Sequence, residues 1–132
     1  MDDYLRPDLS AGLREISVLG LAHIGDAVFE LMVRTWLCET GASTAKGLHG
    51  GAVTFVSAKA QAAAAEKILP ILSEDERAVY KRGRNSQVNS VPKGSTHSEY
   101  HAATGMETLF GYLYLSSKVD RLNELFEKII KT

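Results

Sequence analysis

The sequence has little cysteine and no excess of positive charge, and each shortage excludes a class of protein. The single cysteine, Cys38, excludes an internal disulfide and favours a reducing, cytoplasmic setting. No apolar run reaches the roughly eighteen residues of a membrane span, and the N-terminus lacks the basic and apolar regions of a signal peptide. The net charge of −1 is unlike that of a protein that binds nucleic acid through charge alone. We therefore expect a cytoplasmic globular protein, with Cys38 as a buried apolar side chain.

The length and the apolar periodicity predict one all-α domain over residues 1–132. Apolar residues recur at helical spacing, and no pair of strands is evident. Helices are expected over 10–15, 19–38, 52–69, 73–83, 97–116 and 120–131, with a further short one from Ser43 into Leu48. Ser73 and Glu76 have the spacing of a capping box, and 84–95 is predicted to be an ordered loop. The fold class is a non-parallel bundle of roughly six or seven helices.

The helix expected over 19–38 carries an acid among apolar neighbours. Its polar stripe is His23, Asp26, Glu30 and Arg34, which share one face because they are three or four residues apart. The rest of the helix is almost entirely apolar, so it should lie mostly inside the protein with Asp26 near the core. Glu30 and Arg34 form an ordinary ion pair. The neighbours of Asp26 on this face are His23 and Glu30, and neither is a strong permanent cation. One apolar side is predicted to hold Leu21, Ile24, Val28, Leu31 and Thr35.

A second apolar helix, over 97–116, has one acid, Glu107, in its central part. Each acid has a glycine nearby, Gly25 and Gly105, and such glycines occur where helix backbones approach closely or a ligand needs room. A buried carboxylate is costly unless it is paired or binds a metal. If the two helices pack together, Asp26 and Glu107 would hold one divalent cation, and oxygen ligands suit Mg²⁺. Alternatively, buried carboxylates of this kind anchor helix ends and loops.

Several stretches of the chain together match the motifs of one known family. The first is a version of the family's signature helix, whose core is Gly-Asp-Ala. The stretches are Leu21-Ala22-His23-Ile24-Gly25-Asp26-Ala27-Val28-Phe29-Glu30, Phe55-Val56-Ser57-Ala58-Lys59-Ala60-Gln61-Ala62, Arg82-Gly83-Arg84-Asn85, Val91-Pro92-Lys93, and Glu107 with Leu109 and Gly111-Tyr112-Leu113-Tyr114-Leu115. They follow one another in order along essentially the whole chain. Together they resemble the ribonuclease III family, in particular its mini branch, mini-ribonuclease III, and the agreement of several motifs makes the resemblance specific.

The resemblance implies the ribonuclease III endonuclease fold and an obligate homodimer with an RNA cleft across the two protomers. It implies a Mg²⁺-dependent endoribonuclease that cleaves double-stranded RNA, with Asp26 and Glu107 as catalytic residues and metal ligands. The branch trims precursors of large-subunit (23S) ribosomal RNA in bacteria. Hydrolysis by an activated water, without the 2′-hydroxyl as nucleophile, would leave 5′-phosphate ends. No C-terminal double-stranded-RNA-binding domain is expected, so selectivity would depend on RNA shape or on a ribosomal protein as partner.

Double-stranded RNA is recognised mostly by shape, through contacts to phosphates and 2′-hydroxyls. The candidates for these contacts are basic or amide side chains from the matching stretches. They are Arg82, Arg84, Asn85 and Lys93, with Lys59 as a further one. The alternative for each is an ordinary solvated side chain. With so few cations, RNA binding should be weak and sensitive to salt.

The sequence also departs from the family's pattern. Two positions that carry acids in full-length ribonuclease III fall on Ala22 and Thr104, and an acid that the mini branch carries after the Pro-Lys pair falls on Thr96, with Glu99 three residues further on. These departures leave fewer protein ligands for a metal. Two alternatives follow: an inactive relative that binds RNA as a docking module, and a helical dimerisation protein whose acids are structural.

Overall fold

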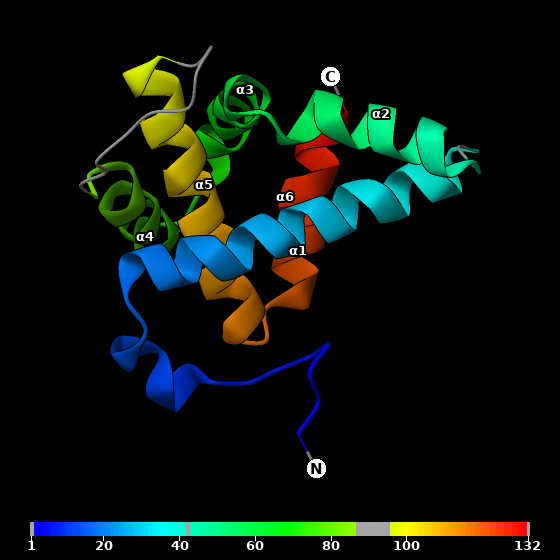
Figure 1. The fold of residues 1–132 in the computed structure, drawn as a ribbon. Coiled ribbons are helices and arrows are strands. Elements are labelled where there is room, and N and C mark those ends of the chain that lie inside the picture. The colour runs from blue at the N-terminus through cyan, green and yellow to red at the C-terminus, as the bar shows by residue number, and fades with distance from the viewer. Residues whose placement is uncertain (1, 42, 87–95, 132) are drawn as a thin grey trace.

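The structure, a computed structural model, describes residues 2–41, 43–86 and 96–131 (Figure 1). Every regular element in these ranges is a helix, which confirms the predicted all-α class. The α-helices are α1 (Val18–Glu39), α2 (Ala45–Val56), α3 (Ala58–Ile68), α4 (Glu74–Arg84), α5 (His97–Leu115) and α6 (Val119–Ile130), and the 3-10 helices are η1 (Ser10–Glu15) and η2 (Leu69–Ile71). Within the same ranges, no helix has both the length and the apolar character needed to cross a bilayer.

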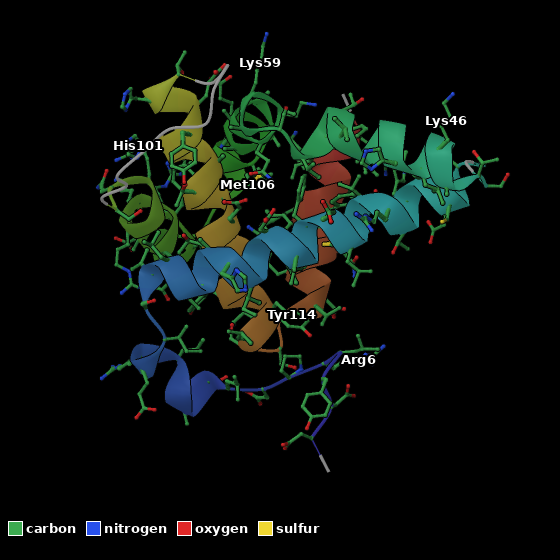
Figure 2. All side chains as sticks on the ribbon, viewed as in Figure 1. Arg6, Lys46, Lys59, His101, Met106 and Tyr114 are labelled. Atoms are coloured by element: carbon green, nitrogen blue, oxygen red, sulfur yellow. The ribbon has the colours of Figure 1, made fainter. Side chains whose placement is uncertain are left out.

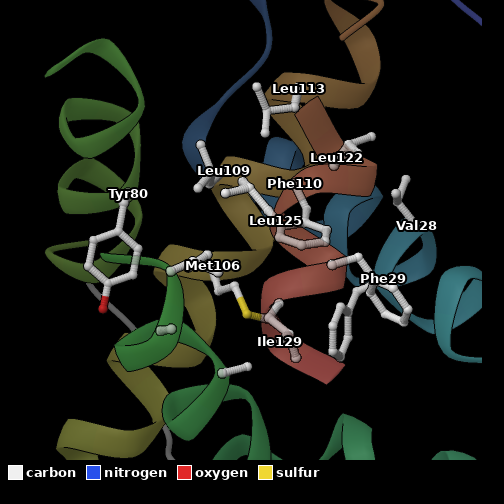
Figure 3. Close-up of a cluster of buried hydrophobic side chains, with 14 of the residues drawn as sticks. Val28, Phe29, Tyr80, Met106, Leu109, Phe110, Leu113, Leu122, Leu125 and Ile129 are labelled. Atoms are coloured by element: carbon white, nitrogen blue, oxygen red, sulfur yellow. The ribbon is translucent and has the colours of Figure 1, made fainter. Parts of the chain in front are cut away.

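Helix α5 is the centre of the bundle, because α1, α3, α4 and α6 all pack on it (Figure 1). The core between α1, α5 and α6 contains three aromatic rings. Phe29 meets Phe110 and Phe126 edge to face, with ring centroids 5.6 and 6.0 Å apart. Leu109 and Leu125 are fully buried in the same cluster (Figure 3). Apolar burial on all these helices holds α5 in place relative to α1.

Glycines bring the backbones of α1 and α5 into contact where the two helices cross. A Cβ atom at Gly25 would lie 1.6 Å from the carbonyl oxygen of Glu107, and one at Gly111 would lie 2.0 Å from that of Leu21. Real side chains cannot be accommodated at such distances, so the crossing requires glycine on both helices. This confirms the expected close approach at Gly25. It also places Asp26, the next residue of α1, at the level of Glu107.

The break between α2 and α3 corrects the predicted helix over 52–69. The short helix expected from Ser43 instead runs from Ala45 to Val56, and a second helix begins at Ala58. Ser57 separates them with an extended backbone (φ −65°, ψ 154°), and its Oγ accepts a hydrogen bond from the backbone N–H of Ala60 at 3.2 Å. A serine that caps the following helix competes with helix continuation, and apolar periodicity does not detect this.

Burial on α1 also differs from the expectation. Leu31 is 57% exposed, and both Thr35 and Cys38 are exposed, so the helix does not lie mostly inside the protein and Cys38 is not a buried apolar side chain. The reason is that α2, α4 and α5 cover only part of the circumference of α1. Two further predictions are confirmed, whereas residues 87–95 of the loop predicted over 84–95 lie outside the described residues. The Ser73–Glu76 capping box is present, and α6 buries Leu122, Leu125, Phe126 and Ile129 as expected.

Candidate active site

Asp26 and Glu107 come together where α1 crosses α5. Gly25 lies against the backbone of Glu107, and the two carboxyl groups are close enough to interact through charge and a hydrogen bond. Glu107 is partly buried, whereas Asp26 is exposed. The expectation that Asp26 lies near the core is therefore wrong, because the polar stripe of α1 faces outward. The pair forms a shallow centre with Asp26 at its rim and Glu107 behind it.

The surroundings of Glu107 disfavour its charged form. Burial raises its pKa to about 8, with further contributions from the negative charge of Asp26 and the hydrogen bond between the two carboxyl groups, and an interaction with Gln61 opposes the rise. Glu76 shows the contrast, because hydrogen bonds from the Arg121 guanidinium, at 2.8 and 2.9 Å, lower the pKa of that carboxyl. Glu107 makes no ion pair among the described residues. It is an acid held beside a second acid without a protein cation.

The donor set at this centre fits a divalent cation of the Mg²⁺ type. Two adjacent carboxylates repel each other, and a bound cation would remove that repulsion. Mg²⁺ binds through one or two carboxylates and keeps several waters, and the exposed side of Asp26 leaves room for them. Within the described ranges, no cluster of three or more histidine, cysteine or acidic side chains is found. The two carboxylates would therefore be completed by water and substrate oxygens.

Ala22 and Thr104, where the resemblance places two further acids of full-length ribonuclease III, supply no free oxygen. Ala22 is buried and has no polar atom in its side chain. Thr104 is buried too, and its hydroxyl donates a hydrogen bond to the carbonyl oxygen of Tyr100 at 2.9 Å. That hydroxyl is engaged within α5. The acidic character of the centre therefore rests on Asp26 and Glu107.

Gln61 is a residue of the centre that sequence reasoning missed. Its side chain is 1% exposed and interacts with Glu107, yet its Nε2 atom has no hydrogen-bond partner of good geometry among the described residues. Within an alanine-rich helix it is the single polar member of the buried face, which also holds Ala64, Ala65 and Ile68. The signal in the sequence is the helical spacing of Gln61 with Ala64, Ala65 and Ile68, which places it on the buried face. Buried glutamine is uncommon, so this position could have been singled out.

The described basic candidates do not form one cluster. Lys59 is exposed in the first turn of α3 and points outward (Figure 2). Arg84 is exposed at the end of α4, where its Nε lies 3.3 Å from Asn85 Oδ1 and its guanidinium lies 6.0 Å from the ring centroid of Tyr80. The side chains of Arg82 and Arg84 leave α4 in directions about 200° apart around the helix axis, because each residue of an α-helix turns about 100°.

Arg82 instead lines a cavity of about 450 Å³ between η1, α1 and α4, together with Arg14. It is therefore on a different side of α4 from Arg84 and Asn85. Lys93 lies outside the described residues. Of the four candidates that the structure describes, only Arg84 and Asn85 share a hydrogen bond with each other.

The raised pKa of Glu107 predicts how stability depends on pH when divalent cations are absent. The carboxyl binds its proton more tightly in the folded protein, with a pKa of about 8 against an ordinary value of 4.5. Its contribution to the free energy of unfolding is therefore complete below about pH 4.5 and is lost as the pH rises through about 8. Urea unfolding in EDTA should show a lower midpoint at about pH 9 than at about pH 6. Glu107→Gln should flatten this slope, and an unchanged slope in that variant would contradict the assignment.

Comparisons with known proteins agree on one family. The model of the ribonuclease III domain matches residues 19–118. A Mini-ribonuclease 3 from Thermoanaerobacter sp. is 42% identical over 116 residues, which cover 88% of this chain and 82% of the relative. A Mini-ribonuclease 3 from Enterococcus faecalis is 39% identical over 120 residues, or 89% of this chain and 91% of the relative.

A solved structure supports the same relationship. A crystal structure of a protein from Fusobacterium nucleatum superposes with a TM-score of 0.82 at 32% identity, over 90% of this chain and 97% of that one. The matched region contains both helices of the acidic centre, since it extends from residue 19 to residue 118. The chain therefore belongs to the ribonuclease III family of endoribonucleases, and it is similar over most of its length to proteins named Mini-ribonuclease 3.

Proposed function

We propose that this protein is a Mg²⁺-dependent endonuclease that cleaves double-stranded RNA and leaves 5′-phosphate and 3′-hydroxyl ends. The observation that carries the proposal is the meeting of Asp26 and Glu107 at the glycine crossing of α1 and α5. A carboxylate pair without a protein cation, open to solvent on one side, is suited to a metal that also contacts a phosphate.

Each acid has a distinct part in this proposal. Asp26, at the rim, would hold the cation on the side that faces the scissile phosphate. Glu107, behind it, would hold the same cation from the core side, after losing the proton that its raised pKa retains. Mg²⁺ bound there would act as a Lewis acid and lower the pKa of water. The rigid crossing would keep the two carboxylates in place without reorganisation during the reaction.

RNA contacts would come from the exposed basic and amide side chains. Arg84 and Asn85 form one contact point and Lys59 another, with Lys93 from the segment outside the described residues. Arg82 faces the η1 side and would contact RNA only at a separate point. Phosphates and 2′-hydroxyls of a duplex are spread over a wide minor groove, so separate contact points suit recognition by shape. The affinity should fall steeply with salt.

We extend the proposal to the biological substrate. The role that the resemblance implies is maturation of 23S ribosomal RNA precursor ends in a bacterium. This RNA is made in the cytoplasm, which is where the protein would act. A ribosomal protein would be an additional partner that presents the duplex.

The exposed apolar surface of α1 supports a homodimer. Two adjoining grooves of about 340 and 360 Å³ lie between α1 and α6 and share Leu31, Met32 and Asn123. The first is lined mostly by apolar side chains, and Leu31 is 57% exposed. A contiguous apolar surface of this kind is typical of a subunit interface. A second copy of the chain, related by a twofold axis, would cover α1 and bring two centres to one duplex.

Leu31→Glu tests the dimer. A carboxylate within an apolar interface should weaken association by roughly a hundred-fold or more, whereas the exposed position should leave the monomer folded. Light scattering coupled to gel filtration should then report half the wild-type mass. Val53→Glu is the control, because Val53 is 51% exposed on α2 and lines neither groove. A Leu31→Glu protein that stays dimeric would exclude this surface as the interface.

The function is tested by comparing substrates. The protein should cut a long RNA duplex with Mg²⁺, and should cut neither single strand of the same sequence nor the corresponding DNA duplex. Labelling of the products should find 5′-phosphates. RNA binding without cleavage would instead favour the second candidate, a docking module, for which the absence of acids at Ala22 and Thr104 is the specific observation.

A further inference from the structure

The strongest unexplained feature of the molecule is the buried amide of Gln61. Its side chain is 1% exposed, and Nε2 is shielded from solvent without a hydrogen-bond partner of good geometry among the described residues. A buried donor left unpaired destabilises the folded protein. Such a cost requires a compensating role, and the polar group that Gln61 reaches is the Glu107 carboxyl.

The packing of α3 on α5 explains why Gln61 reaches this carboxyl. The buried face of α3 consists of Gln61, Ala64, Ala65 and Ile68, and the small alanine side chains allow α3 to approach α5 closely. Serine at position 57 begins α3 one turn before Gln61. The amide is therefore held by a helix and not by a loop. The Glu107 carboxyl has Asp26 and Gln61 beside it, from two different helices.

A neutral donor is the group that such a position requires. A lysine or arginine there would neutralise Glu107 and compete with a divalent cation. A third carboxylate would add repulsion to an acid pair that already disfavours charge on Glu107. An amide N–H can donate to one carboxylate oxygen and leave the other oxygen free. An oxygen of the Glu107 carboxyl could therefore satisfy the unpaired Nε2, and the second oxygen would stay free on the side of Asp26.

We propose that Gln61 is a positioning residue of the metal centre, whose amide N–H holds the Glu107 carboxylate in the orientation that binds the divalent cation together with Asp26. The inference rests on the proposed function, since it assigns a role within that same centre. Metal-ligating carboxylates are themselves commonly hydrogen-bonded, and loss of such a partner typically weakens metal binding by about 10–100-fold. Gln61 would compensate in part for the acids missing at Ala22 and Thr104.

Gln61→Met tests this role, because methionine is similar in length and shape but has no donor. The affinity of the protein for Mn²⁺ in the absence of RNA should fall about tenfold or more. The electron paramagnetic resonance signal of free Mn²⁺ measures this affinity. The Mg²⁺ concentration that gives half-maximal cleavage should rise in parallel, and a large excess of Mg²⁺ should restore cleavage. The urea midpoint in EDTA should stay the same or rise, because an unpaired buried amide has been removed. Gln61→Leu provides a second apolar replacement if the methionine variant does not fold.

Ile68→Val is the matched control on the buried face of the same helix. Ile68 is fully buried, so the smaller side chain should lower the urea midpoint without changing Mn²⁺ affinity. Gln61→Met should therefore lower Mn²⁺ affinity without lowering the urea midpoint, and Ile68→Val should do the reverse. If Gln61 had a merely structural role, both variants would lower the urea midpoint and leave Mn²⁺ affinity unchanged. If the wild type binds Mn²⁺ and cleaves RNA, and Gln61→Met matches it in both, the positioning role of Gln61 is refuted and the proposed function stands. If the wild type does neither, the proposed function fails and this role fails with it.

Discussion

Replacing Glu107 by glutamine is expected to reduce cleavage of duplex RNA by roughly a thousand-fold or more, while RNA binding and the proposed dimer persist. The amide cannot carry the negative charge that holds a divalent cation, and a loss of several kcal/mol of transition-state stabilisation corresponds to this factor. The fold should tolerate the change, because Glu107 is an acid that burial disfavours in its charged form. Single-turnover cleavage with Mg²⁺ measures the rate, and a gel-shift assay measures binding.

Asp26→Asn should have the same effect, because both carboxylates are assigned to one cation. The control is Glu30→Gln, which lies one turn further along α1. Glu30 forms a partly exposed ion pair with Arg34 at 3.0 Å, and such pairs contribute little to stability. This variant should cleave at close to the wild-type rate. Wild-type cleavage by either Glu107→Gln or Asp26→Asn would remove that residue from the mechanism.

Gly25→Ala is expected to lower the free energy of unfolding by about 3 kcal/mol or more, or to prevent folding. The new Cβ atom would lie 1.6 Å from the carbonyl oxygen of Glu107, and a backbone atom in the middle of α5 cannot move aside as a flexible side chain can. The helices would have to separate, which would also separate Asp26 from Glu107. Chemical unfolding measures the stability, and cleavage should be lost together with it.

Gly50→Ala is the matched control for this prediction. Gly50 is an exposed residue within α2, and a Cβ atom there would meet nothing within 4 Å. Alanine should therefore stabilise the protein by about 0.5–1 kcal/mol through its higher helix propensity. If Gly25→Ala were as stable as Gly50→Ala, the close crossing of α1 and α5 would be contradicted.

The parts of the fold that depend on local chemistry could be predicted from the sequence. Apolar periodicity located α1, α4, α5 and α6 to within a few residues, and Ser73 with Glu76 marked the start of α4. The glycine at position 25 correctly indicated a close approach between helices. The two isolated acids do lie close together, but the expectation was based in part on burial of Asp26, which is exposed. These arguments need only neighbours in sequence and a general energetic rule.

The parts that depend on which neighbour covers which face could not be predicted in this way. The outward direction of Asp26 and the exposure of Leu31 and Cys38 arise because α2, α4 and α5 leave one side of α1 uncovered. A helix made of apolar residues looks the same in sequence whether its partner is its own chain or a second copy. Gln61 was missed because its contact with Glu107 joins α3 to α5, a pairing that the sequence does not specify.

The most direct test is to locate the cation itself. The protein would be crystallised with Mn²⁺, and diffraction data would be recorded near the manganese absorption edge. The anomalous difference map should show a peak between the carboxylates of Asp26 and Glu107. Glu107→Gln crystals treated in the same way should lack it. A protein that cleaves duplex RNA with Mn²⁺ but has its peak elsewhere, or none between these two acids, would contradict the proposal that the α1–α5 crossing forms the metal centre.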